Sequence, residues 1–254
     1  MSGRDPIRAF YQDNPRMVSS PFGGVHTFHR ALFEEVLRAL HINVRGKHVL
    51  DVGCGRGLVR ETVEAAGGAY TGCDFVVSGG GFPLAQADAA ALPFAGAAFD
   101  ALFCIDASEH FPDPQRAAAE FHRVLRPGGV FFLSAPNYAN VAGLVKWCCE
   151  RTGRYAPRSW APFGRWQPQE HEAPLTPRRI RRLYRAAGFG DMRCIGYGYE
   201  VGLGLCPWMD HPRTPEAIQF RLQRLFRTVG PAIARVCPSA SLHLFWRIGK
   251  PDTA

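Results

Sequence analysis

The stretch from Lys47 to Gly57, K-H-V-L-D-V-G-C-G-R-G, predicts a short strand that runs directly into a glycine loop. The residues before the loop are mostly apolar, and so short an apolar run suits a strand that is buried on both faces. Glycines occupy every second position of the loop, and the following L-V-R-E-T-V-E-A-A segment predicts a helix that ends at Gly67. Glycine lets the backbone approach a ligand closely, and the first N–H groups of a helix lack intrahelical partners. The stretch therefore predicts a site for a nucleotide-like ligand.

The spacing of these glycines distinguishes between two kinds of nucleotide site. A dinucleotide-binding loop prefers G-x-G-x-x-G, whereas this loop reads G-x-G-x-G and has Asp51 two positions before its first glycine. It also lacks the Lys-Ser/Thr pair that would hold a phosphate and Mg²⁺. The string D-V-G-C-G-R-G instead resembles the first motif of the class I S-adenosylmethionine-dependent methyltransferases. An ordinary strand-to-helix turn is the structural alternative.

This resemblance implies S-adenosyl-L-methionine as the cofactor and places the loop against its methionine part. In that family the acidic residue, here Asp51, helps to hold the ammonium end of the cofactor. The loop residues implied to line the cofactor are Gly53, Cys54, Gly55 and Gly57.

A second strand, A-Y-T-G-C-D, ends in Asp74, 23 residues after Asp51. A carboxylate at that strand end accepts hydrogen bonds from the two ribose hydroxyls, and Phe75 is placed to lie against the adenine. Most members of the family continue with a helix, but V-V-S-G-G-G-F-P-L contains three consecutive glycines and a proline. We therefore expect a short flexible loop from Ser78 to Pro83.

The segment L-A-Q-A-D-A-A-A-L-P-F resembles the third motif of the family. The resemblance implies that Asp88 accepts the adenine amino group, with the Ala89 backbone beside it. An acid in this position often only caps a local turn. A fourth strand over residues 98–105 follows, and its last residue, Ile105, completes the predicted cofactor set.

The fourth strand leads into D-A-S-E-H-F-P-D-P, a helix, the turn R-P-G-G and a fifth strand, V-F-F-L-S-A-P-N. This E-H…E-x-x-R-V-L-R-P-G-G passage resembles the ubiquinone/menaquinone-type small-molecule methyltransferases, and the likeness covers residues 45–137 well. The fold it implies is α/β and Rossmann-like, with helices on both faces of a mostly parallel seven-stranded sheet. The last strand is expected to run antiparallel between the fifth and the sixth.

Methyl transfer to a hydroxyl requires a base near the carboxyl ends of the strands. His110 is the first candidate because an imidazole accepts a proton near neutral pH. Asp106 stands beside it in the pattern, and His171 is a second candidate base. The D-x-x-E-H group resembles one proposed to hold a divalent cation, but two acids and one histidine are a small ligand set. We predict no metal, and a structural hydrogen-bond pair is the alternative role for Glu109 and His110.

The rest of the chain predicts covering segments. Residues 1–44 are expected to form a lid or leading helix (Thr27–Leu40), with Tyr11, Phe22, His26 and His29 as lid candidates and packing on the sheet favoured. Residues 45–254 form the predicted methyltransferase domain, with insertions at about 138–175 and 203–240. The first insertion contains a short helix (141–149) and a segment rich in proline and aromatic residues.

After the first insertion we expect an arginine-rich helix that starts behind Thr176 and ends at Gly188, and a sixth strand over 191–201. A helix over 215–236, interrupted at Gly230-Pro231, and a seventh strand over 241–250 complete the prediction.

Composition limits the classes of protein that fit. The net charge of +8 is carried mostly by arginine, and the eight cysteines form neither a C-x-x-C pair nor a disulfide framework. No stretch has the length and hydrophobicity of a membrane span or an export signal, so we expect a cytoplasmic protein with at most peripheral membrane contact.

The predicted partner is a small-molecule acceptor methylated at a hydroxyl oxygen. No nucleic acid is expected, and the oligomeric state is open. The alternatives are carbon or nitrogen methylation, a cofactor-binding protein without turnover, and an RNA modifier that uses a basic stripe over residues 178–185 and 221–227.

Overall fold

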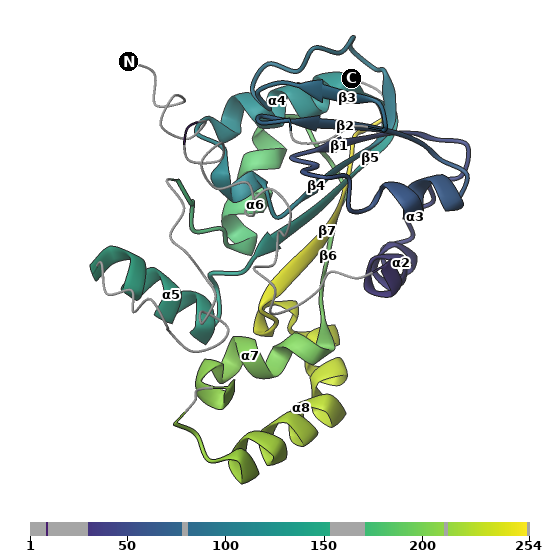
Figure 1. Ribbon diagram of the computed structural model, residues 1–254. Coiled ribbons are helices and arrows are strands. Elements are labelled where there is room, and N and C mark those ends of the chain that lie inside the picture. The colour runs from purple at the N-terminus through teal and green to yellow at the C-terminus, as the bar shows by residue number, and fades with distance from the viewer. Residues whose placement is uncertain (1–8, 10–29, 78–80, 153–170, 211–212, 253–254) are drawn as a thin grey trace.

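A computed structural model describes residues 9, 30–77, 81–152, 171–210 and 213–252 (Figure 1). The four lid candidates and most of the segment rich in proline and aromatic residues lie outside these ranges, as do three residues of the loop after Asp74. The described part of that loop, residues 81–83, contains no helix, as the glycines predicted.

Seven strands form one sheet in the order β3-β2-β1-β4-β5-β7-β6. Only β7 runs against its two neighbours, β5 and β6, and the other described pairings are parallel. This arrangement confirms the predicted fold. The strands are β1 (His48–Val52), β2 (Ala69–Asp74), β3 (Leu84–Gln86), β4 (Phe99–Ile105), β5 (Leu125–Pro136), β6 (Met192–Gly196) and β7 (His243–Gly249).

The helices fall into two groups along the chain. Those that alternate with strands are α2 (Arg30–Ala39), α3 (Arg60–Ala65), α4 (Pro114–Val124) and α6 (Pro177–Ala186). Those that extend beyond the sheet are α5 (Val141–Thr152), α7 (Val201–Leu205) and α8 (Glu216–Val236), with short 3-10 turns η2 (Ser108–His110), η3 (Gly198–Glu200), η4 (Pro207–Asp210) and η5 (Pro238–Ala240). Helix α3 is shorter than predicted because residues 56–59 form turns.

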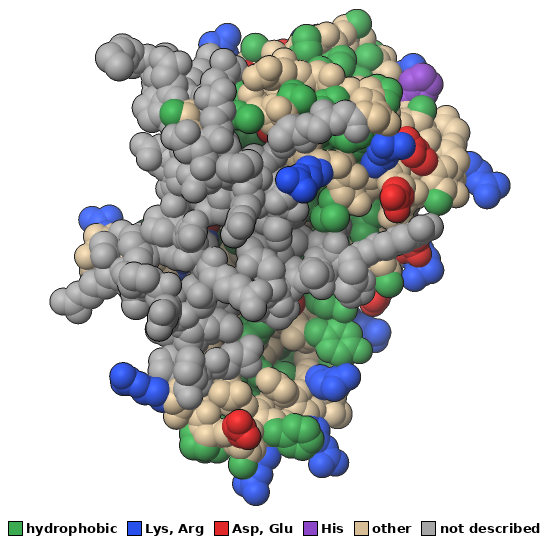
Figure 2. Space-filling model, viewed as in Figure 1, with side chains coloured by type: hydrophobic (Ala, Val, Ile, Leu, Met, Phe, Trp, Pro, Cys, Tyr) green, Lys and Arg blue, Asp and Glu red, His purple; other side chains and the backbone are tan. Residues whose placement is uncertain are grey.

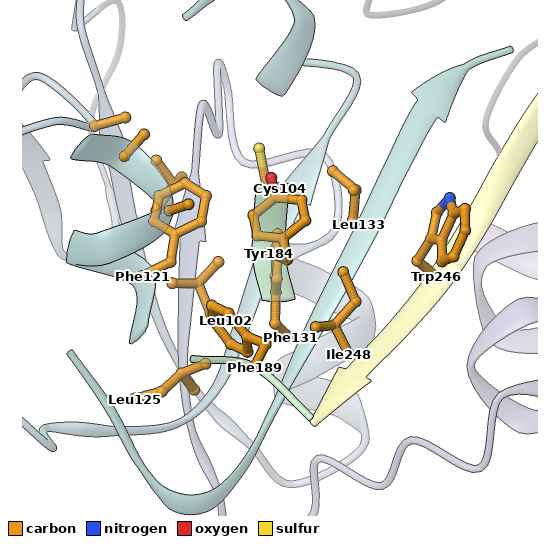
Figure 3. Close-up of a cluster of buried hydrophobic side chains, with 14 of the residues drawn as sticks. Leu102, Cys104, Phe121, Leu125, Phe131, Leu133, Tyr184, Phe189, Trp246 and Ile248 are labelled. Carbon is orange, nitrogen blue, oxygen red and sulfur yellow. The ribbon is translucent and has the colours of Figure 1, made fainter. Parts of the chain in front are cut away.

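One face of the sheet carries the first core cluster. There α4 contributes Phe121 and α6 contributes Tyr184, and both rings meet Phe131 of β5 edge-on (Figure 3). Thr176 accepts a hydrogen bond from the Arg179 N–H, which caps α6 where the sequence predicted its start. The strands between the two faces are buried on both sides, which explains their nearly continuous apolar sequence.

The opposite face is covered by α2. Phe33 lies edge-on to Phe103 of β4 and Phe132 of β5, at centroid distances of 5.6 and 5.7 Å. Burial of one such side chain contributes about 1.5–3 kcal/mol. Helix α2 thus packs on the sheet, with Phe33 buried and Ala31 exposed.

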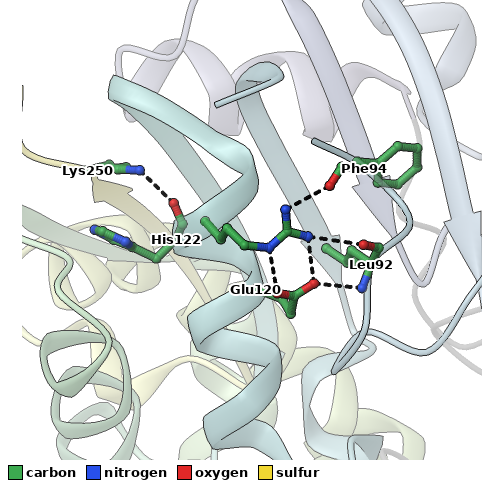
Figure 4. Close-up of polar contacts among 6 residues, drawn as sticks. Leu92, Phe94, Glu120, His122 and Lys250 are labelled. Atoms are coloured by element: carbon green, nitrogen blue, oxygen red, sulfur yellow. Dashed lines mark hydrogen bonds and ion pairs between the residues drawn. The ribbon is translucent and has the colours of Figure 1, made fainter. Parts of the chain in front are cut away.

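A polar clamp explains two residues of the E-x-x-R passage. Glu120 and Arg123 of α4 bond each other and also the backbone of the loop after β3, at Leu92 and Phe94 (Figure 4). Lys250 donates to the carbonyl oxygens of His122 and Leu125, at 2.7 and 2.9 Å, and so satisfies acceptors at the end of α4. Glu120 and Arg123 hold the loop that follows Asp88, and we assign these two residues a structural role.

Besides the shorter α3, four larger differences from the prediction occur. The R-P-G-G turn is a bulge inside β5, where Phe99 pairs with Leu125 and Ala101 with Val130. Strand β6 ends at Gly196, because the chain turns into η3 and α7 instead of continuing to residue 201. Helix α5 extends to Thr152.

The fourth difference is that α8 continues through Gly230-Pro231. Proline removes one helical hydrogen bond, but α8 packs so closely on η3 that a Cβ on Gly230 would lie 2.2 Å from the Gly198 oxygen. This contact stabilises the helix at the position where its sequence predicts a break.

No helix in the described ranges combines the length and hydrophobicity needed to cross a membrane.

Candidate active site

The glycine loop follows β1 in the chain and packs against the segment after β4. All three predicted loop glycines have positive φ, and a Cβ on Gly53 would lie 2.4 Å from the Ala107 Cβ. Substitution of Gly53 would therefore push β1 away from the segment after β4. The N–H groups of Gly53 and Cys54 donate to the Cys73 oxygen of β2, at 2.8 and 3.2 Å. The loop is thus fixed to both neighbouring strands.

Asp51 lies buried beneath this loop. Its Oδ2 accepts a hydrogen bond of 2.7 Å from the Tyr70 hydroxyl, whereas Oδ1 is buried and has no partner among the described residues. Burial raises the pKa of Asp51 to about 7. A buried carboxylate oxygen without a donor is costly unless a ligand supplies one. The residue therefore fits the ammonium end of the predicted cofactor.

Asp74 ends β2 and holds the loop from the other side. Its Oδ2 accepts from the Gly55 N–H at 2.8 Å and its Oδ1 from the Val76 N–H at 3.2 Å. Burial raises the pKa of this carboxyl. Each carboxylate oxygen has two lone pairs, so these backbone bonds leave capacity for hydroxyl donors. Phe75 beside it is half-buried.

The other predicted cofactor residues have these positions. Asp88 follows β3 and accepts a 2.8 Å bond from the Ala90 N–H, which is the local turn named as its alternative role. Ala89 is buried in the first core cluster. Ile105, at the end of β4, is only 7% exposed and packs in the cluster beneath α2. Because β3, β2, β1 and β4 are neighbours, all of these residues lie along one edge of the sheet.

Asp106 begins the second half of this edge. It follows β4 with a φ of 45°, an unusual value for a residue other than glycine. Its Oδ1 accepts from the Ser134 Oγ at 2.6 Å, and its Oδ2 is buried without a partner in the described chain. Burial raises the pKa of Asp106 to about 6. The strained backbone holds this carboxylate between β4 and β5.

His110 lies close by on η2. Its Nδ1 is 2.8 Å from the His171 carbonyl oxygen, and its Nε2 is 3.7 Å from Glu109 Oε1. A carbonyl oxygen can only accept, so Nδ1 carries the proton and Nε2 is the basic nitrogen. Burial lowers the pKa of His110 and raises that of Glu109 well above its usual range. The two predicted histidines are thus brought together, although His171 takes part through its backbone.

The sequence did not predict an ion pair that lies beside His110 and comes from the insertion at residues 138–175. Lys146 of α5 bonds Glu172, which also accepts from the Tyr138 hydroxyl at 2.8 Å. Burial opposes ionisation of Glu172, but Lys146, His110 and the Tyr138 hydroxyl together lower the carboxyl pKa. The only available signals were that Glu172 adjoins His171 and that Lys146 is one of three lysines.

A second missed pair joins η3 to β7. Glu200 Oε1 lies 3.1 Å from the His243 Nδ1, and its Oε2 accepts from the His243 N–H at 2.9 Å. Burial alone would lower the pKa of His243, but Glu200 raises it to about 9, with Asp106 as a further contributor. Nothing in the local sequence of either residue indicates this pairing, because 43 positions separate them.

Both pairs, Lys146–Glu172 and Glu200–His243, are largely buried. Within the described ranges, no cluster of three or more histidine, cysteine, aspartate or glutamate side chains has an arrangement that could hold a metal ion. A neutral imidazole whose Nε2 carries no proton, as in His110, can accept one from a polar group placed beside it.

Comparisons with known proteins agree with this geometry. Residues 50–133 match the model of a family described as a methyltransferase domain. The ubiquinone biosynthesis O-methyltransferase of Chromobacterium violaceum is 30% identical over 174 residues, which cover 63% of this chain and 72% of that protein. The enzyme of the same name from Aromatoleum aromaticum is 36% identical over 170 residues, or 61% of this chain and 69% of that protein.

The fold has solved counterparts. The structure of a SAM-dependent methyltransferase from Archaeoglobus fulgidus superposes with a TM-score of 0.57 at 19% identity, over 87% of this chain and 94% of that one. The sequence relatives, together with the glycine loop and a β7 that runs antiparallel between β5 and β6, establish the family. The chain belongs to the class I S-adenosylmethionine-dependent methyltransferases, and S-adenosyl-L-methionine is its cofactor.

Proposed function

We propose that this methyltransferase modifies a hydroxyl oxygen of a small organic molecule, with His110 as the general base. The observation that carries the proposal is the bond between the His110 Nδ1 and the His171 carbonyl. It fixes the tautomer whose Nε2 can accept a proton. Since burial lowers the pKa of the ring, His110 is neutral and basic at neutral pH.

We further propose how the chain holds its cofactor. Asp51 and residues 53–57 take the methionine part, Asp74 and Phe75 the ribose and adenine, and Asp88, Ala89 and Ile105 the remaining adenine contacts. The unpartnered Oδ1 of Asp51 supports this assignment. When bound, S-adenosyl-L-methionine supplies an electrophilic methyl group on a sulfonium.

Asp106 and His171 position the reacting groups in this proposal. Asp106, held by Ser134, offers its second oxygen to the acceptor hydroxyl. His171 orients His110 through its carbonyl, and its ring is the second candidate base. Holding the acceptor and the base in one geometry lowers the entropic part of the barrier.

The relatives support oxygen as the acceptor atom, because both are named O-methyltransferases of ubiquinone biosynthesis. We extend to this chain a small organic acceptor with a hydroxyl group. The Lys146–Glu172 pair and the Tyr138 hydroxyl, which the insertion adds beside His110, are suited to a polar acceptor.

The decisive experiment incubates the protein with deuteromethyl-labelled S-adenosylmethionine and a panel of phenols, catechols and aminophenols, and detects labelled products by mass spectrometry. We expect a labelled methyl ether from wild type and its loss in His110→Gln, with unchanged cofactor affinity by calorimetry. Products methylated only at nitrogen or carbon would overturn the hydroxyl assignment, and full activity of His110→Gln would overturn the base.

A further inference from the structure

Helix α8 has two apolar faces, and within the described part of the chain only one of them is covered. The covered face contains Phe226, Gly230, Ile233 and Ala234, which pack on α7 and η3. A second stripe repeats at alternating steps of four and three residues along one side of the helix. Its members are Ile218, Leu222, Leu225, Val229, Ala232 and Val236.

Four of these six side chains are exposed, and the other two, Leu222 and Val229, are partly buried. Ile218 is 47% exposed, Leu225 51% and Val236 83%. Trp208 of η4, which contacts α8, is also half exposed. Contiguous exposed apolar side chains on one helix indicate a docking surface rather than scattered surface residues.

The polar side of α8 is strongly basic. Arg221, Arg224, Arg227 and Arg235 are exposed, and Glu216 is the only acid on the helix. Among the ion pairs of the described residues, none engages these four guanidinium groups. Helical spacing puts Arg221, Arg224 and Arg235 on the face adjoining the stripe. Green and blue side chains accordingly intermingle at the end of the molecule where α8 lies (Figure 2).

Helix α6 provides the comparison within the molecule. It also exposes arginines, but its apolar residues Ile180 and Tyr184 are buried in the core. It therefore offers charge without an apolar stripe. Figure 1 shows α6 beside α4 and α8 at another end of the molecule, so the two helices do not form the continuous basic stripe that an RNA modifier would need.

The chemistry of α8 favours a lipid surface over a second copy of this chain. A copy seated on the stripe would bring rows of arginine against each other. A stable dimer also needs about 800 Å² of interface per partner, more than six small aliphatic side chains on one helix provide. A helix with arginines beside exposed aliphatic residues fits the boundary between anionic headgroups and acyl chains. We propose that α8 docks this methyltransferase onto anionic lipid bilayers.

Vesicle co-sedimentation of the full chain tests the proposal. Wild type should pellet with phosphatidylcholine vesicles that contain phosphatidylglycerol and stay in solution with phosphatidylcholine alone. Leu225→Glu/Val236→Glu should weaken binding at least about tenfold, because it removes inserted apolar area. Each of Arg221→Gln and Arg224→Gln should weaken it about fivefold and reduce its sensitivity to salt.

Arg178→Gln/Arg182→Gln on α6 is the matched control and should bind like wild type. Thermal unfolding should show all variants folded, because every substituted side chain is exposed. If the arginine variants of α6 and α8 weakened vesicle binding equally, binding would depend on the net charge of the protein and not on α8. No binding by wild type would overturn the proposal. If sedimentation velocity showed a dimer that Leu225→Glu abolishes, the stripe would instead be an interface with a second copy of this chain.

Discussion

The two halves of the candidate site are built in different ways. The half on β1, β2 and β3 comes from one continuous segment, 48–90, and its acids bond residues of the same segment, as Asp51 does with Tyr70 and Asp74 with Gly55. The half beyond β4 draws Glu172 from an insertion, Glu200 from η3 and His243 from β7. The first half, which we propose binds S-adenosyl-L-methionine, is a local structure, whereas the second depends on how distant segments meet. We infer that acceptor specificity resides in the second half.

The strongest test of this division is His110→Gln. It should lower kcat by about 10²–10⁴-fold, the usual contribution of a positioned base, and leave cofactor affinity within twofold of wild type. Calorimetry and single-turnover kinetics measure the two effects separately. Loss of cofactor binding in this variant would show that the halves are not independent.

Asp51→Asn should separate binding from stability in the first half. Burial raises the pKa of Asp51 from 3.8 to about 7, so the folded state binds more protons than the unfolded state between these values. The wild-type free energy of unfolding should therefore fall as pH rises from 4 to 7, by on the order of 2–4 kcal/mol from this group. The variant should lack that decline and be more stable at pH 8, while its cofactor affinity falls at least about tenfold.

Urea unfolding at pH 5 and pH 8, with calorimetry at pH 8, measures both changes. Equal stability of the variant and wild type at pH 8 would mean that Asp51 is not buried as a charge.

Asp74→Ala should cost about 2 kcal/mol of cofactor binding through lost hydrogen bonds. Asp74→Asn is the matched variant, because its amide oxygen can still accept from the Gly55 N–H while the charge is removed. We expect calorimetry to show that Asp74→Asn binds the cofactor with an affinity between those of wild type and Asp74→Ala. Unchanged affinity in Asp74→Ala would reject the ribose assignment.

The smallest effect concerns the second half. Glu200 raises the pKa of His243 to about 9, so this pair stabilises the fold fully below the unfolded-state pKa of 6.5 and loses that contribution as pH rises towards 9. Glu200→Gln should lower the His243 pKa, followed by NMR, and should remove about 1–2 kcal/mol of the decline in stability between pH 6.5 and 9. An unshifted His243 titration would show that another group holds its proton.

The same division explains what the sequence could predict. Strand β2 and its terminal Asp74 could be predicted from the sequence because strand, turn and acid are adjacent in the chain. Phe33 shows the limit, since its burial depends on which face of the sheet α2 covers. The break predicted at Gly230-Pro231 was wrong because local propensity omits the contact with Gly198. The Glu200–His243 pair forms only when β7 inserts beside β5, and no local sequence pattern predicts which residues this insertion brings together.

The direction of β7 has a practical consequence for work with this protein. Because β7 starts opposite Pro136, at the end of β5, and finishes opposite Val130, near its middle, the chain after Gly249 continues away from the strand ends that carry Asp106 and His110. The Gly128 N–H donates to the carbonyl oxygens of Lys250 and Pro251, at 3.1 and 3.3 Å, and holds this segment there. A fluorophore or a surface linker attached after residue 252 would leave the proposed site open, so immobilised enzyme should retain the activity of free enzyme.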